Sequence, residues 1–230
     1  MLNLKYGRNY TPTGYRLHYR KPELRSLGFL RNAVYQFRIE MPEILPSIWR
    51  RIQVPSDYNF WDLHVAIQDA MGWQDSHLHH FEIKSKGKHK TVKIGIPDFD
   101  LIDDDPEEER FPGWEIPVNA YFNELGVEAR YLYDYGDSWW HTVKLEGYMA
   151  RRQAGKYPAC VDGERACPPE DCGGVTGYAQ LVEILANPEH EEYEEMKIWA
   201  GDKWHPDRFA KDAVKIHDPY KRWKTAFLEP

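Results

Sequence analysis

The sequence predicts an α+β fold, with a mixed β-sheet at its centre and helices concentrated toward the C-terminus. Two observations lead to this prediction. Several short stretches before residue 147 alternate apolar and polar residues with the period of two that is typical of β-strands. One stretch among them, and several after Gly174, instead repeat apolar residues at helical spacing.

The first elements follow the order strand, strand, helix, strand. Residues 34–41 and 48–54 alternate apolar and polar side chains, and the proline-containing segment between them suits a hairpin loop. Residues 78–84 repeat the pattern after the helix, and residues 91–95 add a further strand. These stretches predict the first four strands of the sheet.

A helix is predicted over residues 60–71. Asn59 provides an N-cap, and an acidic residue stands at the third helical position, close to the pattern of a capping box. Leu63 and Ile67 share one face with other apolar residues, so we expect both side chains to be buried against the sheet. Gly72 stands where the helix ends.

A central hairpin is predicted from residues 130–135 and 140–146, which flank a Gly-Asp-Ser turn. Aromatic residues on both sides of such a turn mainly pack against each other. Asp134, Asp137 and His141 lie close to the turn in sequence, so the hairpin is also a candidate for framing a polar pocket.

The rest of the chain predicts loops and then helices. The acidic run at 98–110 indicates a solvated loop, and residues 117–125 predict a short helix. The expected C-terminal helices cover residues 178–186, residues 188–200 with Tyr193, Met196 and Trp199 facing inward, and short segments from 207 and at 219–228.

The cysteines lie together after the hairpin, spaced C-x6-C-x4-C at Cys160, Cys167 and Cys172. This spacing differs from the paired C-x2-C of common zinc sites. The preferred interpretation is that the cysteines pack as small buried side chains in a rigid cover. Binding of a metal such as zinc by these thiols is the alternative.

Histidines offer a second set of candidate metal ligands. His77 and His79 are expected on one side of a strand, and His141 is a natural third ligand. A pair of histidines among apolar residues is more often held by hydrogen bonds in the core, and this is the preferred interpretation.

The hairpin and the segment from Cys160 to Gly174 are expected to meet and form the most polar concave surface. Only a short connection separates them, and prolines and paired glycines restrict the path of the second. Clustered carboxylates raise one another's pKa unless a cation lies among them. The residues of this candidate polar site are Asp134, Asp137, His141, Asp162, Glu164, Asp171 and, as the nearest cation in sequence, Arg165.

Bulk properties restrict the class of protein. The chain has 230 residues and a formal net charge of −7, which argues against general binding to a phosphate backbone, although a local basic patch could still bind one. No apolar run reaches the length of a membrane span, and three cysteines without secretory features indicate a reducing compartment. We therefore expect a cytoplasmic protein with a protein or nucleic-acid partner and no membrane partner.

Residues 1–33 are expected to form a basic, aromatic N-terminal arm, and residues 34–230 a single domain. The arm interleaves Lys and Arg with tyrosines and contains one acidic residue, Glu23. Such a segment can bind nucleic acid or an acidic partner. Packing of the arm over the domain is the preferred interpretation.

Several segments together resemble the plasmid pRiA4b ORF-3-like family. They are IWRRIQVPSDYNFWDLHVAIQDAMGWQDSHLHHFEI, YDYGDSWWHTVKLE, YPACVDGERACPPEDCGGVTGY and NPEHEEYEEMKIW, in this order within about 34–209. The turn is YDYGD where the family pattern is YDFGD. The resemblance implies an α+β fold with a β-grasp-like strand–strand–helix–strand opening and a link to mobile elements. It implies no established reaction and no named catalytic residue.

Two function classes follow. The first is a non-enzymatic binding or accessory module linked to mobile elements, favoured because the sequence lacks the common nucleophile, phosphate-loop, zinc-protease and dinucleotide motifs. The second is a metal-dependent hydrolase or nuclease, in which the histidines, acids and cysteines above hold a metal that activates water. A zinc-stabilised scaffold would need only the cysteines and one histidine.

Overall fold

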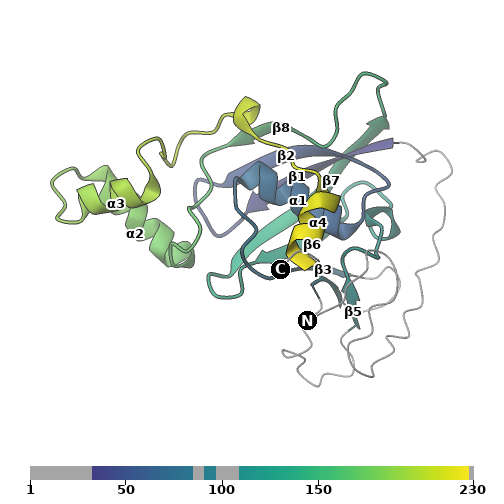
Figure 1. The fold of residues 1–230 in the computed structure, drawn as a ribbon, viewed down its shortest axis with the longest axis horizontal. Coiled ribbons are helices and arrows are strands. Elements are labelled where there is room, and N and C mark those ends of the chain that lie inside the picture. Colours follow the sequence, from purple (N-terminus) through teal and green to yellow (C-terminus); the bar gives the residue numbers. More distant parts are fainter. Residues whose placement is uncertain (1–32, 85–90, 97–108, 228–230) are drawn as a thin grey trace.

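The computed structural model describes residues 33–84, 91–96 and 109–227, and their fold is α+β, as predicted (Figure 1). Its strands are β1 (Ala33–Met41), β2 (Ile48–Pro55), β3 (His79–Lys84), β4 (Thr91–Gly95), β5 (Glu109–Pro112), β6 (Glu128–Tyr133), β7 (Trp139–Ala150) and β8 (Ala159–Glu164). Its helices are α1 (Phe60–Met71), α2 (Gly174–Ala186), α3 (Tyr193–Ala200) and α4 (Pro219–Phe227), with 3₁₀ turns at Val118–Ala120 and Lys211–Ala213.

All eight strands join one mixed sheet in the order β5-β4-β3-β6-β7-β1-β2-β8. Neighbouring strands are antiparallel except for β4 and β5, which are parallel. The predicted order strand, strand, helix, strand is confirmed for β1, β2, α1 and β3. The central hairpin of β6 and β7 lies between β3 and β1, so it occupies the middle of the sheet.

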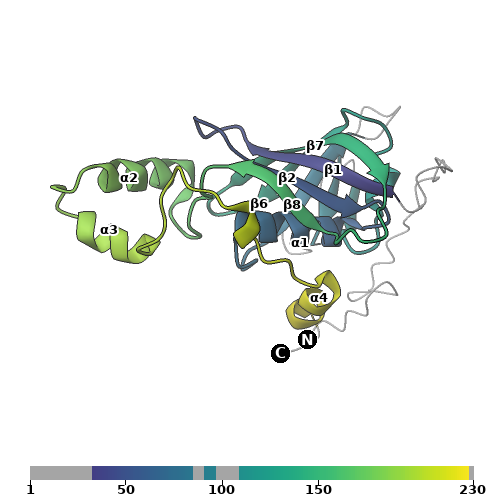
Figure 2. The ribbon, with the colours of Figure 1, turned by 90° about the horizontal axis from the view of Figure 1, so that it is seen from above.

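The core lies between one face of the sheet and α1, as Figure 2 shows from above. Alternate residues of β1 point into it, and Tyr35, Phe37 and Ile39 are fully buried. Leu63 and Ile67 of α1 are buried opposite them, which confirms the predicted orientation of the helix. Burial of these apolar faces is what drives the sheet and the helix together.

Helix α1 begins and ends where its sequence predicts. Asn59 accepts a hydrogen bond from the backbone N–H of Asp62, and the Asp62 carboxylate accepts one from the backbone N–H of Asn59. This reciprocal pair is a capping box. Gly72 ends the helix in the left-handed conformation, which glycine adopts without steric cost.

The C-terminal helices are present, but α3 differs from its prediction. Residues 188–192 form turns, so the helix begins later than expected. Tyr193, Met196 and Trp199 were expected to face inward, yet no residue of α3 is buried and the Trp199 side chain is largely exposed. The reason is that α2 and α3 extend beyond the end of the sheet, where α3 packs mainly against α2 (Figures 1 and 2).

Helix α4 lies on the far side of α1 from the sheet (Figure 2). Its Trp223 is fully buried in a small cluster with Trp61 of α1. Arg222 Nη2 lies 3.0 Å from the Asp69 carboxylate, which ties α4 to the C-terminal turn of α1. Among the helices of the described ranges, none combines the length and apolar composition needed to cross a membrane.

Three predicted segments differ from the structure or lie outside the described residues. The cysteine segment begins as strand β8, paired with β2 at the sheet edge, where a rigid loop was expected. The end of the acidic run forms β5, while its residues 98–108 lie outside the described ranges. The predicted N-terminal arm also lies outside them, apart from Ala33, which begins β1.

Candidate functional site

The central hairpin and the cysteine segment meet at the turn that connects β6 to β7. Asp137 accepts a hydrogen bond from the backbone N–H of Gly173 through Oδ2, at 3.1 Å. The hydroxyl of Tyr133 donates to the Glu170 carboxylate. The side chain of Asp137 and the last residue of β6 therefore hold the cysteine segment against the hairpin.

His77, Asp134 and Asp171 come together at this junction. His77 Nε2 lies 3.1 Å from Asp171 Oδ1 and 3.5 Å from Asp134 Oδ2. Both aspartates have positive φ angles, 59° at Asp134 and 60° at Asp171, which aspartate tolerates better than most residues. Asp134 Oδ1 also accepts the backbone N–H of Gly136 at 2.8 Å, so the turn fixes the direction of its second oxygen toward His77.

The other predicted polar residues have separate partners. Asp162 on β8 pairs with Arg51 at 2.9 Å, and Glu164 accepts a hydrogen bond from the indole of Trp49. Arg165 pairs with Asp207 and donates to the backbone of Pro46. These contacts place Asp162, Glu164 and Arg165 along the edge formed by β2 and β8.

His141 is buried in the core on β7. Its Nδ1 lies 3.3 Å from the backbone oxygen of Tyr131, and its ring meets the ring of Trp73 edge-on. Burial lowers the pKa of His141 from its ordinary 6.5 to about 4, so the imidazole is neutral at physiological pH.

All three cysteines are free thiols. Burial raises the pKa of Cys167 and of Cys172 to about 12 and also raises that of Cys160. Cys167 is buried in the core beside the cavity described below, and Cys160 lies on β8. Within the described ranges, neither group of three close metal-ligand side chains includes a cysteine.

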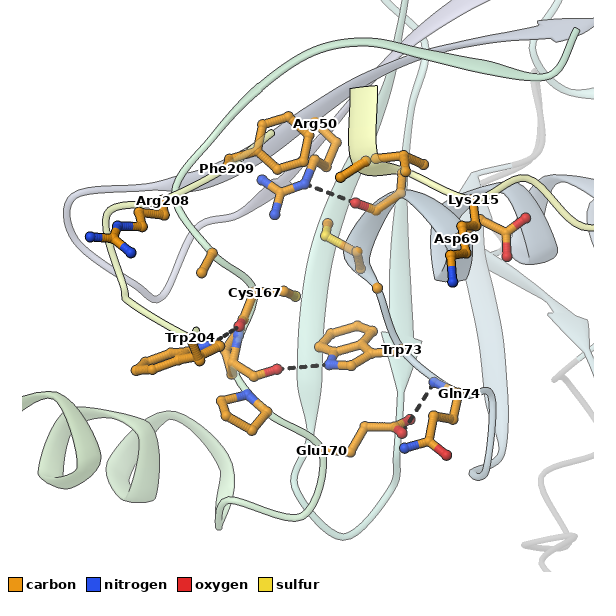
Figure 3. Close-up of a pocket in the computed structure, with 18 of the residues that line it drawn as sticks. Arg50, Asp69, Trp73, Gln74, Cys167, Glu170, Trp204, Arg208, Phe209 and Lys215 are labelled. Carbon is orange, nitrogen blue, oxygen red and sulfur yellow. Dashed lines mark hydrogen bonds between the residues drawn. The ribbon is translucent and has the colours of Figure 1, made fainter. Parts of the chain in front are cut away.

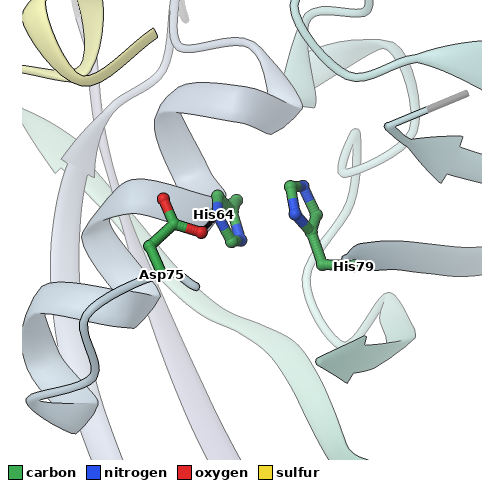
Figure 4. A group of neighbouring side chains, drawn as sticks. All are labelled: His64, Asp75 and His79. Carbon is green, nitrogen blue, oxygen red and sulfur yellow. Dashed lines mark hydrogen bonds and ion pairs between the residues drawn. The ribbon is translucent and has the colours of Figure 1, made fainter. Parts of the chain in front are cut away.

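A second group, formed by His64, Asp75 and His79, is buried under α1 (Figure 4). His64 Nε2 lies 2.7 Å from Asp75, and its Nδ1 lies 2.8 Å from the hydroxyl of Tyr131. The rings of His64 and His79 are stacked, with centroids 3.4 Å apart and planes within 6° of each other. A metal bound by two imidazoles lies in the plane of both rings, and parallel planes share no such position. The group is therefore a feature of the core, in which His64 is hydrogen-bonded to Asp75 and Tyr131 and His79 stacks on it.

A cavity of about 810 Å³ lies beside the cysteine segment (Figure 3). Three parts of the chain line it: the end of α1 with the turn after it, residues 166–171, and the segment from Trp199 to His217. Trp73 donates from Nε1 to the backbone of Pro168 at 2.9 Å, and Trp204 donates to the backbone of Cys167 at 3.0 Å. These two indoles fix the cysteine segment as one wall.

Arg50 of β2 also lines the cavity, although it is only 1% exposed. Its Nε donates to the backbone oxygen of Ala70 at 2.9 Å, and its guanidinium lies over the ring of Phe209, 3.8 Å from the centroid. Desolvation by burial lowers the pKa of Arg50, and the Cys167 and Cys160 thiols have the opposite, smaller effect.

The sequence contains a signal for Arg50, although Arg50 is not among the predicted site residues. In the predicted strand 48–54 the alternation places Arg50 in phase with Ile48, Ile52 and Val54, all of which are buried. An arginine at an inward-facing position of a strand is a buried cation. Buried cations are rare unless a partner binds the charge, so such an arginine is a candidate site residue. Trp204 and Phe209 of the aromatic wall had no comparable signal, because they come from a segment with little regular structure.

Comparison with known proteins shows the family of this chain. A family model described as plasmid pRiA4b ORF-3-like protein matches residues 33–213. An uncharacterised protein, y4hQ of Sinorhizobium fredii (strain NBRC 101917 / NGR234), is 32% identical over 171 residues, covering 74% of this chain and 81% of the relative. The crystal structure of MM3350 from Methanosarcina mazei Go1, a protein of unknown function, has 39% identity and a TM-score of 0.71, covering 80% of this chain and 98% of that one. The chain belongs to the plasmid pRiA4b ORF-3-like family.

Proposed function

We propose that this protein is a non-enzymatic binding module, and that the cavity beside the cysteine segment is its binding site. The bound group would be a small organic molecule or a protruding group of a protein or nucleic-acid partner. A role as an accessory to mobile elements is part of the proposal, and it rests on the plasmid named in the family description.

The size and lining of the cavity support this proposal. A volume of about 810 Å³ falls in the range of small-molecule sites, which are concave, largely apolar and equipped with a few polar groups. Aromatic side chains from separate segments line it, namely Trp73, Trp199, Trp204 and Phe209. Aromatic walls with charged groups between them are suited to holding a planar or apolar body in one orientation.

The reactive groups that line the cavity are held in ways that suit binding better than chemistry. The Cys167 thiol, with a pKa of about 12, is almost entirely protonated at neutral pH and is therefore a poor nucleophile. Asp69 accepts hydrogen bonds from the backbone N–H of His217 and from Arg222, and also contacts the His217 ring. Its carboxylate is thus occupied in holding the C-terminal segment.

A neutral fluorescent probe tests the proposal. Phenylnaphthylamine, which brightens in apolar sites, is expected to bind with one-to-one stoichiometry. Ala213→Trp places a large side chain at the cavity lining and should weaken this binding, while Ala179→Trp, at an exposed position of α2 outside the lining, should leave it unchanged. Absence of saturable binding, or equal binding to both variants, would show that the cavity is not a ligand site.

A metal-dependent hydrolase is the second candidate, and the group of His77, Asp134 and Asp171 favours it. One imidazole nitrogen and two carboxylate oxygens lie within 4.8 Å of one another, and these ligand types suit zinc and other divalent transition metals. Bound there, a metal would supply a water activated for attack. A simpler account is a contact between the His77 ring and the two carboxylates without a metal.

Metal analysis separates the two candidates. Protein purified without a histidine tag is expected to carry no stoichiometric zinc or manganese if binding in the cavity is its function. The hydrolase candidate instead requires stoichiometric metal that is lost in Asp134→Asn and retained in Asp162→Asn, whose carboxylate pairs with Arg51 away from the group.

A further inference from the structure

We propose that the cavity selects organic anions, and that Arg50 is the residue that recognises the anionic group. The ligand class is a carboxylate, phosphate or sulfonate attached to an aromatic or apolar body. This inference rests on the proposed function, because it assigns a ligand class to the same cavity.

The first argument is the position of Arg50. It occupies an inward-facing position of β2 between Ile48 and Ile52, so its charge lies in the core of the protein. Three hydrogen bonds hold it, from Nε to the backbone of Ala70 and from Nη1 to the backbones of Trp49 and Glu164. The guanidinium is therefore fixed before any ligand arrives, which reduces the entropy lost on binding.

The second argument is the missing negative charge. All three acceptors of Arg50 are neutral carbonyls, and among the described residues no carboxylate pairs with it and Nη2 has no acceptor. Its ionisable neighbours are the thiols of Cys167 and Cys160, whose pKa values are raised by burial, so both are neutral near pH 7. The carbonyl end of α1 compensates the cation in part through Ala70. A buried cation without a full counter-charge favours binding of an anion.

The third argument is the charge balance of the lining. Arg208 and Lys215 also line the cavity, and within the described ranges neither forms an ion pair. The lining contains three acids: Asp69 pairs with Arg222, Asp171 contacts the ring of His77, and Glu170 accepts hydrogen bonds from two neutral groups, the Tyr133 hydroxyl and the backbone of Gln74. Arg50, Arg208 and Lys215 thus stand against one lining acid without a charged or imidazole partner, Glu170, so an anion enters more favourably than a cation.

The fourth argument concerns the body of the ligand. Phe209 covers one face of the Arg50 guanidinium, and the indoles of Trp73 and Trp204 are fixed by hydrogen bonds to the cysteine segment. The anion subsite thus adjoins aromatic walls, as Figure 3 shows for these side chains. A ligand that combines an anionic group with a planar or apolar body fits both features.

Two probes of similar shape test the inference. Anilinonaphthalene sulfonate carries a sulfonate, whereas phenylnaphthylamine has the same aromatic framework without it. Since hydrogen bonds to charged groups are strong, the wild-type protein should bind the sulfonate at least about tenfold more tightly than the neutral probe. Arg50→Gln should abolish this preference and leave the affinity for the neutral probe nearly unchanged. The neighbouring Arg51→Gln, which pairs with Glu146 and Asp162 outside the cavity, should retain it.

Arg50 also supports the fold, so a second variant is needed. The double substitution of Arg208 and Lys215 by glutamine, at exposed positions, should keep the fold and lower the affinity for the sulfonate more than that for the neutral probe. If both probes bind the wild type equally, or if folded Arg50→Gln keeps the preference, Arg50 does not select anions although the cavity still binds ligands. If neither probe binds, the proposed binding function is wrong as well.

Discussion

The imidazole rings of His64 and His79 lie face to face, 3.4 Å apart between centroids, in the buried region under α1. His64 uses both ring nitrogens, toward Asp75 and toward Tyr131, whereas His79 Nδ1 is buried without a hydrogen-bond partner among the described residues. The pKa of His79 lies well below its ordinary value. Desolvation by burial is the largest cause, and the nearby His64 is the next. Protonation of His79 at low pH should therefore destabilise the folded protein.

Replacing His79 should reduce the acid sensitivity of the fold. Below the unfolded pKa of about 6.5 the unfolded chain binds a proton at His79 that the folded chain does not, so the unfolding free energy falls as the pH falls. His79→Phe keeps a stacked ring and removes this group. The slope of the unfolding free energy between about pH 5 and 6.5 should then decrease by up to about 1.4 kcal/mol per pH unit.

Urea denaturation at several pH values measures this slope. His141, with a folded pKa of about 4, contributes in the same direction, so part of the acid sensitivity will remain in His79→Phe. His205→Gln alters an exposed histidine and should leave the slope unchanged. An identical slope for wild type and His79→Phe would mean that His79 can be protonated in the folded protein.

Truncation of Leu63 should destabilise the protein strongly. Its side chain is fully buried between α1 and the sheet, so Leu63→Ala leaves a cavity and should lower the unfolding free energy by about 2–5 kcal/mol. Leu45→Ala provides the matched control, because the Leu45 side chain is 87% exposed and its loss should change stability by less than about 0.5 kcal/mol. Equal losses in chemical denaturation would contradict the packing of α1.

The contact between hairpin and cysteine segment depends on Gly174. It has a φ of 67°, and a Cβ added there would lie 2.7 Å from the backbone oxygen of Asp137. Gly126, with a φ of 85°, has open space around the same position. Gly126→Ala should cost about 1–2 kcal/mol for the backbone conformation alone. Gly174→Ala should cost about 1–3 kcal/mol more, because the chain must also shift.

Thermal unfolding of both variants tests this contact. The difference between them isolates the steric term, since both substitutions place alanine at a positive φ. If Gly174→Ala were no less stable than Gly126→Ala, the two segments would not be in contact at this point.

The thiols of Cys167 and Cys172 should react slowly in the folded protein. A pKa of about 12 leaves about one ten-thousandth of Cys167 and Cys172 as thiolate near pH 8, and the thiolate is the reactive form. Alkylation by iodoacetamide, followed by peptide mass spectrometry, should label both positions slowly without denaturant and completely in urea. Fast labelling of folded protein would indicate that this segment opens readily.

Local rules were sufficient for much of the fold. The limits of α1 follow from Asn59 and Gly72, which act within one turn of the chain, and the faces of β1 and β2 follow from strict alternation. The inward orientation predicted for α3 failed because amphipathic spacing does not indicate whether a surface is present to receive it. Whether such a surface is present depends on how far α2 extends beyond the sheet.

The candidate site was harder to predict, because its members meet through long-range pairing. His77 and Asp134 approach each other since β3 pairs with β6, and Asp171 joins them from a segment held by Asp137. No spacing in the sequence encodes these distances. Asp162 and Glu164 are close to Asp171 in sequence. The pairing of β8 with β2 nevertheless holds them away from this group. Proximity along the chain was therefore a poor guide here.

The wall formed by residues 204–217 has a consequence for how the protein is made. The sheet is complete at Glu164, so on a growing chain its strands and α1 can pair before this wall has been synthesised. Until then Phe209 is not yet in place over the Arg50 guanidinium. On a growing chain the sheet can therefore assemble before residues 204–217 close the cavity that we propose as the binding site.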